Sequence, residues 1–415
     1  MTGPGGRIQS RPGEPALAHR ICIDARKIED FGIGTYIRNL ITHLAEVDLE
    51  NRYVLLTRGT REFPLTLPDN FQVLQERAPV YSIRELGTLS WRLLRLDVDL
   101  YHATHYVLPA VVPCAAVATI HDIIHLLYPE YLPSRLAFFY AQRMIRRTLT
   151  RGDRIIAVSK NTKTDLARYF EVDGGKIHVV YNGVDDLFRR RLPEEEISRW
   201  LRSLEVERPY VLFVGNAAKP HKNLDNVVRA FARARKRHPF EARLVCVGER
   251  GPATFKIEQR AAQLGISDRL VMLGHVAREA LPALYQGATL FVYPTLYEGF
   301  GLPVVEAMAS GVPVVTSNTS ALKEVAEGHA HLVDPLNVDA IAEAIAHCMA
   351  DPQHRASLAR LGLRRAEEFG WRRTAERTLE IYRGAIAAAA RGRHLWGGRS
   401  GAVGRGGGAG GEGRG

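Results

Sequence analysis

Short apolar runs alternate along the chain with longer segments in which apolar residues recur every three or four positions. The runs are four to six residues long, which is typical of buried strands, whereas the longer spacing is typical of helices that cover a sheet. The expected strands are 20–24, 53–56, 71–74, 100–103, 115–120, 154–158, 176–180, 210–214, 243–248, 269–274, 289–293 and 312–316. The expected helices are 37–45, 134–151, 160–170, 224–234, 337–349, 353–369 and 371–390.

This alternation predicts an α/β fold with parallel sheets, because parallel strands need a crossover connection that is usually a helix. The pattern of strand, loop and helix restarts at residue 210, after a polar segment at 193–196 that we interpret as a connector. A chain of 415 residues is also too long for one ordinary core. We therefore expect two Rossmann-like domains, 20–190 and 205–370, followed by a C-terminal helix at 371–390.

The two ends of the chain differ in composition from the rest. Residues 1–19 and 391–415 are rich in Gly and Arg and show no periodicity, so we expect both segments to be disordered. The N-terminus lacks the apolar core of a signal peptide, and no run is long enough to span a bilayer. The prediction is a cytoplasmic protein. The four cysteines are scattered and form no CxxC pair, so we interpret them as small buried apolar residues.

The stretch 297–311, YEGFGLPVVEAMASG, carries the clearest signal for a binding site. Gly299 and Gly301 allow a tight turn after the strand 289–293, and Pro303 suits the first turn of a helix. Free amides at a helix start favour an anion such as a phosphate. Glu298 and Glu306 bracket the turn, and Glu306 lies among apolar residues, where a carboxylate needs donors such as sugar hydroxyls.

The same stretch resembles the signature of retaining glycosyltransferases of family four, which have the two-domain fold called GT-B. The resemblance implies that Glu298 contacts the donor sugar and that Glu306 holds the ribose of the nucleotide. It also implies that the backbone at Phe300, Gly301 and Leu302 receives the diphosphate. On its own, a pair of glutamates would more often be exposed or ion-paired.

Further segments resemble the same family. TIHDIIHLLYPE matches the segment whose first histidine faces the donor sugar, which implies that role for His121 and leaves His105 and His125 open. VGNAAKPHKNLDNVVRAF matches the phosphate-binding segment and implies that Lys222 contacts the diphosphate, with Lys219 nearby. The family often has Arg where this chain has Asn216. The loop with Gly32 and Gly34 resembles one that approaches the donor phosphates and the acceptor, and Gly248 and 274–276 resemble loops that contact the base.

The resemblance implies transfer of a hexose from a nucleotide sugar to a glycan or lipid-linked acceptor, without a metal or another cofactor. Mannose from GDP-mannose is favoured, and UDP-glucose, UDP-GlcNAc or a GT-B sugar-nucleotide epimerase are the alternatives. The net charge of +11 and the basic segments 84–96 and 134–151 are compatible with peripheral contact with an anionic membrane. They are also compatible with a nucleic-acid binder, but the tail lacks interleaved Phe or Tyr, so no nucleic-acid partner is expected.

Overall fold

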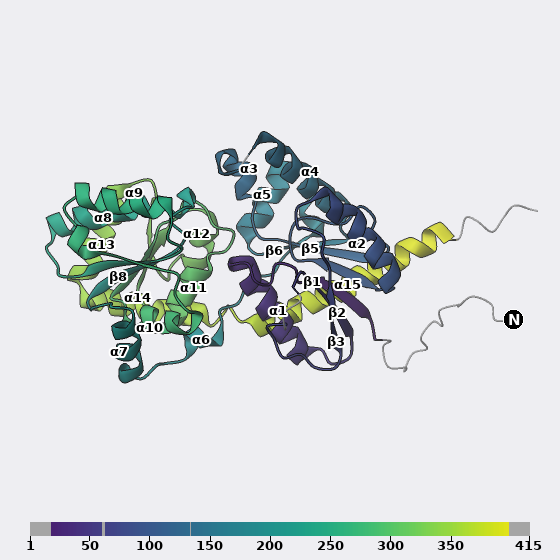
Figure 1. The fold of residues 1–415 in the computed structure, drawn as a ribbon, viewed down its shortest axis with the longest axis horizontal. Coiled ribbons are helices and arrows are strands. Elements are labelled where there is room, and N and C mark those ends of the chain that lie inside the picture. The colour runs from purple at the N-terminus through teal and green to yellow at the C-terminus, as the bar shows by residue number, and fades with distance from the viewer. Residues whose placement is uncertain (1–17, 60–62, 133, 398–415) are drawn as a thin grey trace, which may run out of the picture.

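Two parallel β-sheets, each covered by helices on both faces, form two α/β domains that lie side by side in the computed structural model (Figure 1). The structure describes residues 18–59, 63–132 and 134–397. The expected termini therefore lie mostly outside the described residues. All strand pairs in both sheets are parallel, as the alternation of strands and helices predicts.

The N-terminal domain has a seven-stranded sheet in the order β3-β2-β1-β4-β5-β6-β7. Its strands are β1 (Arg20–Asp24), β2 (Arg52–Thr57), β3 (Phe71–Gln75), β4 (Leu100–Ala103), β5 (Ala115–Ile120), β6 (Arg154–Ala157) and β7 (Ile177–Val179). Its helices are α1 (Gly32–Val47), α2 (Ile83–Leu96), α3 (Ile124–Leu127), α4 (Arg135–Arg151) and α5 (Lys160–Phe170), with short 3₁₀ turns η1 (Pro129–Tyr131) and η2 (Gly174–Lys176).

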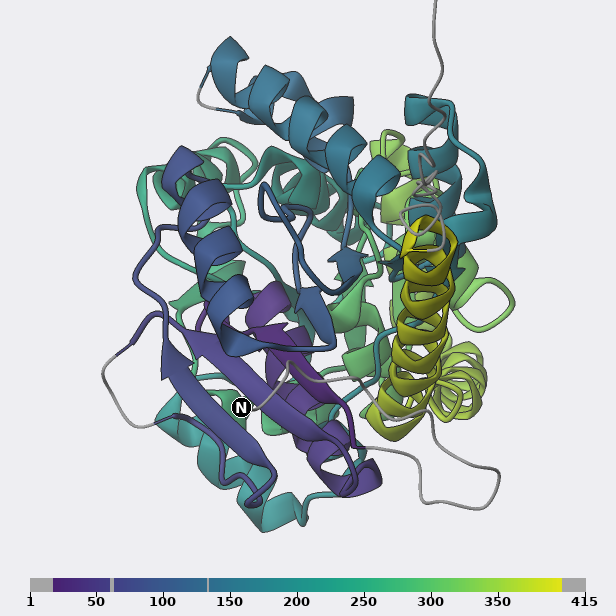
Figure 2. The ribbon, with the colours of Figure 1, turned by 90° about the vertical axis from the view of Figure 1, so that its right-hand side faces the viewer.

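Strand residues of this domain alternate between two apolar clusters on opposite faces of the sheet. Ile21 and Ile23 of β1 pack with α1 and α15 (Trp371–Gly397), whereas Cys22 between them packs with α2, α4 and α5. Because successive side chains of a strand point to opposite faces, a strand buried on both sides reads as one continuous apolar run. Figure 2 views this domain from its end, with α15 beside the sheet.

The second domain has a six-stranded sheet in the order β10-β9-β8-β11-β12-β13. Its strands are β8 (Tyr210–Val214), β9 (Arg243–Val247), β10 (Leu270–Gly274), β11 (Leu290–Tyr293), β12 (Val314–Ser317) and β13 (His331–Val333). Its helices are α8 (Leu224–Arg237), α9 (Pro252–Gln263), α10 (Leu281–Gly287), α11 (Leu302–Ala309), α12 (Ser320–Ala326), α13 (Val338–Ala350) and α14 (Pro352–Ala366). The 3₁₀ turns are η3 (Pro220–Lys222), η4 (Ser267–Arg269) and η5 (Arg278–Ala280).

The chain crosses between the domains twice. The first crossing runs through α6 (Asp186–Arg189) and α7 (Glu194–Ser203), and the second leads into α15, which packs back on α1, β4 and β5 of the N-terminal domain. The two crossings touch, because Val184 pairs with Gly370 and a Cβ on Gly183 would lie 2.3 Å from the Trp371 nitrogen. Only a glycine at position 183 allows this contact between the crossings.

Four local expectations were wrong. The segment at 193–196 is the start of helix α7, whose three glutamates lie in the first turn, where the helix dipole favours negative charge. Gly32 and Gly34 lie inside α1 rather than in a loop before it. The strand β13 was missed because it has only three residues. The last helix continues to Gly397, beyond the expected end at 390, while residues 398–415 lie outside the described part.

The described residues contain no helix that is both long enough and apolar enough to cross a membrane. All four cysteines are buried, and none of them forms a disulfide bond among the described residues.

Candidate active site

A cleft between the two domains lies at the carboxyl ends of β5, β8 and β11, the edge at which open parallel sheets bind ligands. Its volume is about 440 Å³. The N-terminal domain contributes the segment after β5, and the second domain contributes the loop after β8 and the start of the 297–311 stretch. The lining residues are Asp122, Ile124, His125, Glu130, Tyr131, Ala218, Lys219, Pro220, His221, Lys222, Tyr297, Glu298 and Gly299.

Gly299 brings the two domains into direct contact at the edge of this cleft. A Cβ at this position would lie 2.0 Å from the carbonyl oxygen of His121, closer than any side chain allows. The hydroxyl of Thr162 lies 3.3 Å from that oxygen and 3.2 Å from the carbonyl oxygen of Gly299. The glycine therefore permits an interdomain contact as well as a turn.

Lys222 and Glu298 form an ion pair in the cleft, with 2.7 Å between Nζ and Oε1. The Tyr293 hydroxyl donates to the same carboxylate oxygen at 2.9 Å and accepts from Lys222 Nζ at 3.0 Å. Burial by itself would lower the pKa of the lysine, but the Glu298 carboxylate outweighs burial and raises it. Lys222 is therefore a fixed cation at neutral pH, held where a negatively charged group could take the place of Glu298.

His121 is a neutral imidazole at neutral pH, because burial lowers its pKa to about 4. Its Nε2 lies 3.0 Å from the carbonyl oxygen of Thr104. A carbonyl can only accept, so Nε2 carries the proton and Nδ1 is left as an acceptor. The ring packs edge-on against Tyr36 of α1, which fixes its plane. His121 can therefore accept a hydrogen bond from a ligand hydroxyl.

Glu306 lies on α11, and its Oε2 accepts a hydrogen bond of 3.0 Å from the Tyr285 hydroxyl. Burial raises its pKa to about 7, although the Tyr285 bond and the charge of Arg278 oppose this. Arg278 is paired with Asp185, whose charge also acts on Glu306. This carboxylate is thus held near its titration point with few donors, and hydroxyl donors from a ligand would stabilise its ionised form.

The backbone before α11 presents free amides. No acceptor among the described residues bonds to the N–H groups of Phe300, Gly301 or Leu302. Gly301 has φ +97°, and a Cβ there would lie 2.4 Å from Leu322 Cδ2, so this turn needs glycine. Phe300 is buried, and Leu302 packs on the cores of both domains. The start of α11 is therefore a rigid donor group at the domain boundary.

Three other residues of the predicted site, Asn216, Gly32 and Gly34, do not line the cleft. Asn216 uses both ends of its amide within its own domain, bonding Glu249 Oε2 at 3.0 Å and the Ala218 amide at 2.8 Å. Gly32 lies in the first turn of α1 with open space where a Cβ would be. At Gly34 a Cβ would lie 2.5 Å from the Ile28 carbonyl oxygen, so this glycine serves close packing of α1.

The structure locates His105 and His125, whose roles the sequence left undecided. His125 lines the cleft, whereas His105 is 2% exposed and lies within 3.5 Å of both Asp24 and Glu85. Arg26 bonds the same two carboxylates, so this group is a compensated ionic cluster in the N-terminal domain.

His221 also lines the cleft, and the sequence pattern predicted no role for it. Burial lowers its pKa to about 4, and its Nδ1 is buried without a hydrogen-bond partner among the described residues. Its position directly before Lys222 in KPHK was the available signal. Asn223 does not cap α8 with its side chain, and instead donates to the carbonyl oxygens of Pro294 and Pro335.

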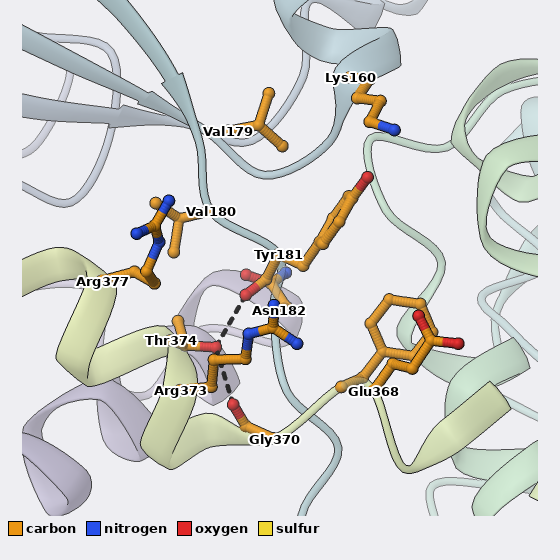
Figure 3. A pocket seen from close by; sticks show the side chains of 11 residues that line it. Lys160, Val179, Val180, Tyr181, Asn182, Glu368, Gly370, Arg373, Thr374 and Arg377 are labelled. Atoms are coloured by element: carbon orange, nitrogen blue, oxygen red, sulfur yellow. Dashed lines mark hydrogen bonds between the residues drawn. The ribbon is translucent and has the colours of Figure 1, made fainter. Parts of the chain in front are cut away.

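A second cavity, of about 280 Å³, lies where the chain crosses between the domains (Figure 3). Thr374 donates to the Tyr181 carbonyl oxygen at 2.7 Å and ties α15 to the first crossing. Beside it, Glu324 of α12 accepts the amides of Lys160 and Asn161 at 3.0 Å each, and the Tyr181 hydroxyl at 2.5 Å. A carboxylate of one domain thus caps the first turn of α5 in the other and joins the two domains beside this cavity.

Two protein-family models match consecutive parts of the chain. Residues 32–186 match Glycosyltransferase Family 4, and residues 195–364 match Glycosyl transferases group 1. The two matches divide at the boundary between the two sheets.

The chain is also similar in sequence and in fold to individual proteins. The chain is 31% identical over 301 residues to O-antigen chain mannosyltransferase B of Escherichia coli, which covers 71% of this chain and 76% of that protein. It is 34% identical over 252 residues to the MMP alpha-(1->4)-mannosyltransferase of Mycolicibacterium hassiacum, covering 60% and 58%. Sucrose-phosphate synthase from Thermosynechococcus elongatus superposes with a TM-score of 0.73 at 22% identity, covering 89% of this chain and all of that chain.

The fold and the cleft define a two-domain glycosyltransferase with the GT-B architecture, as predicted. The chain belongs to the family that joins the Glycosyltransferase Family 4 and Glycosyl transferases group 1 domains. It is a hexosyltransferase.

Proposed function

We propose that the protein is a retaining glycosyltransferase that moves mannose from GDP-mannose to a hydroxyl of a glycan or lipid-linked acceptor. The observation that carries this proposal is the Lys222–Glu298 pair, which lines the interdomain cleft beside Gly299. Gly299 contacts the backbone of His121, although the side chains of His121 and Glu306 do not line this cleft. A cation, a carboxylate and a neutral imidazole are the groups needed to hold a diphosphate next to a polyhydroxylated sugar.

Lys222 and the free amides of Phe300, Gly301 and Leu302 receive the diphosphate. Negative charge grows on this group as the bond to the sugar breaks, and fixed donors in a cleft stabilise it without reorganising. In the absence of donor, Lys222 is neutralised by Glu298. Binding of the diphosphate therefore exchanges one anionic partner of Lys222 for another and frees Glu298 for the sugar.

Glu298 and His121 then orient the sugar by accepting bonds from its hydroxyls, and the Nδ1 lone pair of His121 suits this role. Glu306 accepts the two ribose hydroxyls. Such bonds to a charged acceptor contribute about 1.5–3 kcal/mol each, enough to decide where the donor lies.

Retention follows from front-side attack, in which the departing phosphate takes the proton of the acceptor hydroxyl. A covalent route would need a free carboxylate beside the sugar. Glu298, once freed from Lys222, is assigned to the sugar hydroxyls, and Asp122 accepts the Ile124 amide at 3.0 Å. The anomeric configuration of the product, read by NMR from an α-linked donor, tests this step: a β-linked product contradicts it.

Mannose is favoured because two relatives that are 31% and 34% identical to this chain are named mannosyltransferases. The test is a thermal-shift and donor-hydrolysis panel of GDP-mannose, UDP-glucose, UDP-GlcNAc and their parent nucleotides, with and without EDTA. We expect GDP-mannose to give the largest shift and to lose its sugar equally well in EDTA. If UDP sugars dominate, the donor assignment is wrong. If no donor binds, the whole assignment of the cleft fails.

A lipid-linked acceptor agrees with the surface of the N-terminal domain. Helices α2 and α4 expose apolar side chains among arginines, namely Ile83, Trp91 and Leu94 on α2 and Leu136 and Phe139 on α4. A basic amphipathic surface binds anionic lipid because its apolar side chains enter the bilayer and its arginines attract the lipid headgroups. Sedimentation with anionic vesicles should fall for Trp91→Ser with Leu94→Ser, and unchanged binding would remove this part of the proposal.

A further inference from the structure

A cluster of histidines and one cysteine lies in the second domain, on elements that the cleft does not use. His331 belongs to the edge strand β13, Cys348 to the last turn of α13, and His354 to the first turn of α14. One ligand atom from each of the three lies within 4.8 Å of the other two. Figure 1 shows α13 and α14 in this domain.

We propose that His331, Cys348 and His354 bind one Zn²⁺ ion that holds β13, α13 and α14 together. Zn²⁺ prefers sulfur and imidazole nitrogen, with bond lengths of about 2.0–2.3 Å and tetrahedral geometry, which places ligand atoms roughly 3.5 Å apart. Each separation is at most 4.8 Å and needs to shorten by no more than roughly 1.3 Å to reach that spacing. A mixed thiolate and imidazole set also disfavours Mg²⁺ and Ca²⁺, which prefer oxygen.

The surroundings of the cluster agree with a ligand. Nε2 of His354 is buried and has no hydrogen-bond partner among the described residues, which costs free energy unless something binds it. The Cys348 side chain is fully buried, yet it lies beside two imidazoles rather than among apolar groups alone. His331 and His354 are only partly buried, so an ion can enter from solvent.

The local backbone holds the ligands in place. The Asp351 carboxylate accepts the amides of Gln353 and His354 at 2.9 Å each, and it fixes the first turn of α14 directly after α13 ends. The ring of His347 stacks on that of His354, with centroids 4.4 Å apart. The imidazole rings of His331 and His354 and the thiol of Cys348 thus meet where α13 ends and α14 begins.

Binding releases one proton, because the Cys348 thiol must lose its hydrogen to solvent when the sulfur–zinc bond forms, while the two imidazoles bind as neutral ligands. No electrons are exchanged. The fourth coordination position is left to water. The sequence reading interpreted the cysteines as buried apolar residues and found no metal motif, since His331 lies 17 positions before Cys348 and the spacing is not that of a known motif.

The site is structural and separate from the sugar-transfer site. Helix α14 packs against α11, and a Cβ on Gly362 of α14 would lie 3.1 Å from Met308 Cγ of α11. An ion that fixes α14 therefore supports the back of the helix whose start faces the cleft. The proposal does not depend on the proposed donor or acceptor.

The test uses the full chain without a histidine tag, which is stripped with chelator, incubated with excess Zn²⁺ or Co²⁺ and then dialysed against metal-free buffer. We expect one equivalent of Zn²⁺ per chain by elemental analysis, and a Co²⁺ derivative with the near-ultraviolet charge-transfer band of a thiolate ligand. His354→Gln and His331→Asn should each weaken Zn²⁺ binding at least about tenfold. The matched control is His329→Gln, on the turn before β13, which should bind Zn²⁺ like the wild type.

Wild-type Zn²⁺ affinity in His354→Gln and His331→Asn, or a Co²⁺ spectrum without the thiolate band, overturns the proposal. Cys348→Ser tests the sulfur ligand directly, and it should remove the band while circular dichroism reports whether the chain stays folded. Because the two histidine variants replace partly exposed side chains, the result does not depend on the cysteine variant folding.

Discussion

Replacing Glu306 with glutamine should have opposite effects on stability and on donor binding. Burial raises the pKa of this carboxyl from 4.5 to about 7. The folded protein therefore holds the proton more tightly than the unfolded chain does. The stability of the protonated form is fully present below pH 4.5 and is lost as the pH rises through about 7.

The size of this loss follows from the pKa. At about 1.4 kcal/mol per pKa unit, ionisation at pH 8 costs the folded state up to about 3 kcal/mol. The side chain is only partly buried, so solvent screens part of this cost and we expect about 1–3 kcal/mol. Glutamine cannot ionise and can still accept the bond from the Tyr285 hydroxyl. Glu306→Gln should therefore be more stable than the wild type by this amount at pH 8 and nearly equal at pH 4.5.

Donor binding should change in the other direction. An ionised carboxylate can accept both ribose hydroxyls, whereas an amide offers one acceptor and a donor group that opposes the second hydroxyl. Loss of one charged hydrogen bond of about 1.5–3 kcal/mol predicts roughly 10- to 100-fold weaker nucleotide binding. In the wild type, binding should tighten as the pH rises from 6 to 8.

Urea unfolding at several pH values and nucleotide titration calorimetry check the two effects. The control is Glu279→Gln, an exposed residue of η5 directly after Arg278, which should match the wild type in both assays. A Glu306→Gln variant that is less stable than the wild type at pH 8, or that binds nucleotide equally well, would refute the reasoning about burial and ribose contact.

The remaining predictions concern the cleft and the contact between domains. Lys222→Ala should lower kcat about 10²–10³-fold with an unchanged circular dichroism spectrum, whereas Lys219→Ala, on the same loop, should cost far less; equal losses would contradict the assignment. Gly299→Ala should abolish turnover while both domains stay folded, because the Cβ would meet the His121 carbonyl oxygen; near-normal kcat would show that the domains need not approach so closely. Glu324→Gln removes the charge that caps α5, so the first-turn amides of α5 should exchange hydrogen faster and small-angle scattering should show a more open molecule; unchanged exchange would show that the cap does not hold the domains.

The sequence alone determined the two sheets and most of their helices. Strands such as Ile21–Ile23 are apolar at every position because both faces of a parallel sheet are buried, and this local property is visible without coordinates. The 297–311 stretch likewise carries its own turn, since Gly301 needs a positive φ wherever the chain goes afterwards. Periodicity also predicted where the pattern restarts for the second domain.

Only the tertiary structure decided which groups meet. Lys222 and Glu298 are 76 positions apart, and the Glu324 carboxylate reaches the Lys160 amide across 164 positions. The first contact depends on the strand order, which makes β8 and β11 neighbours in one sheet, and the second depends on how the two domains pack against each other. No local pattern encodes either arrangement. The three-residue strand β13, and with it the approach of His331 to Cys348, was hidden for the same reason: its pairing with β12 is set by the sheet and not by its own few residues.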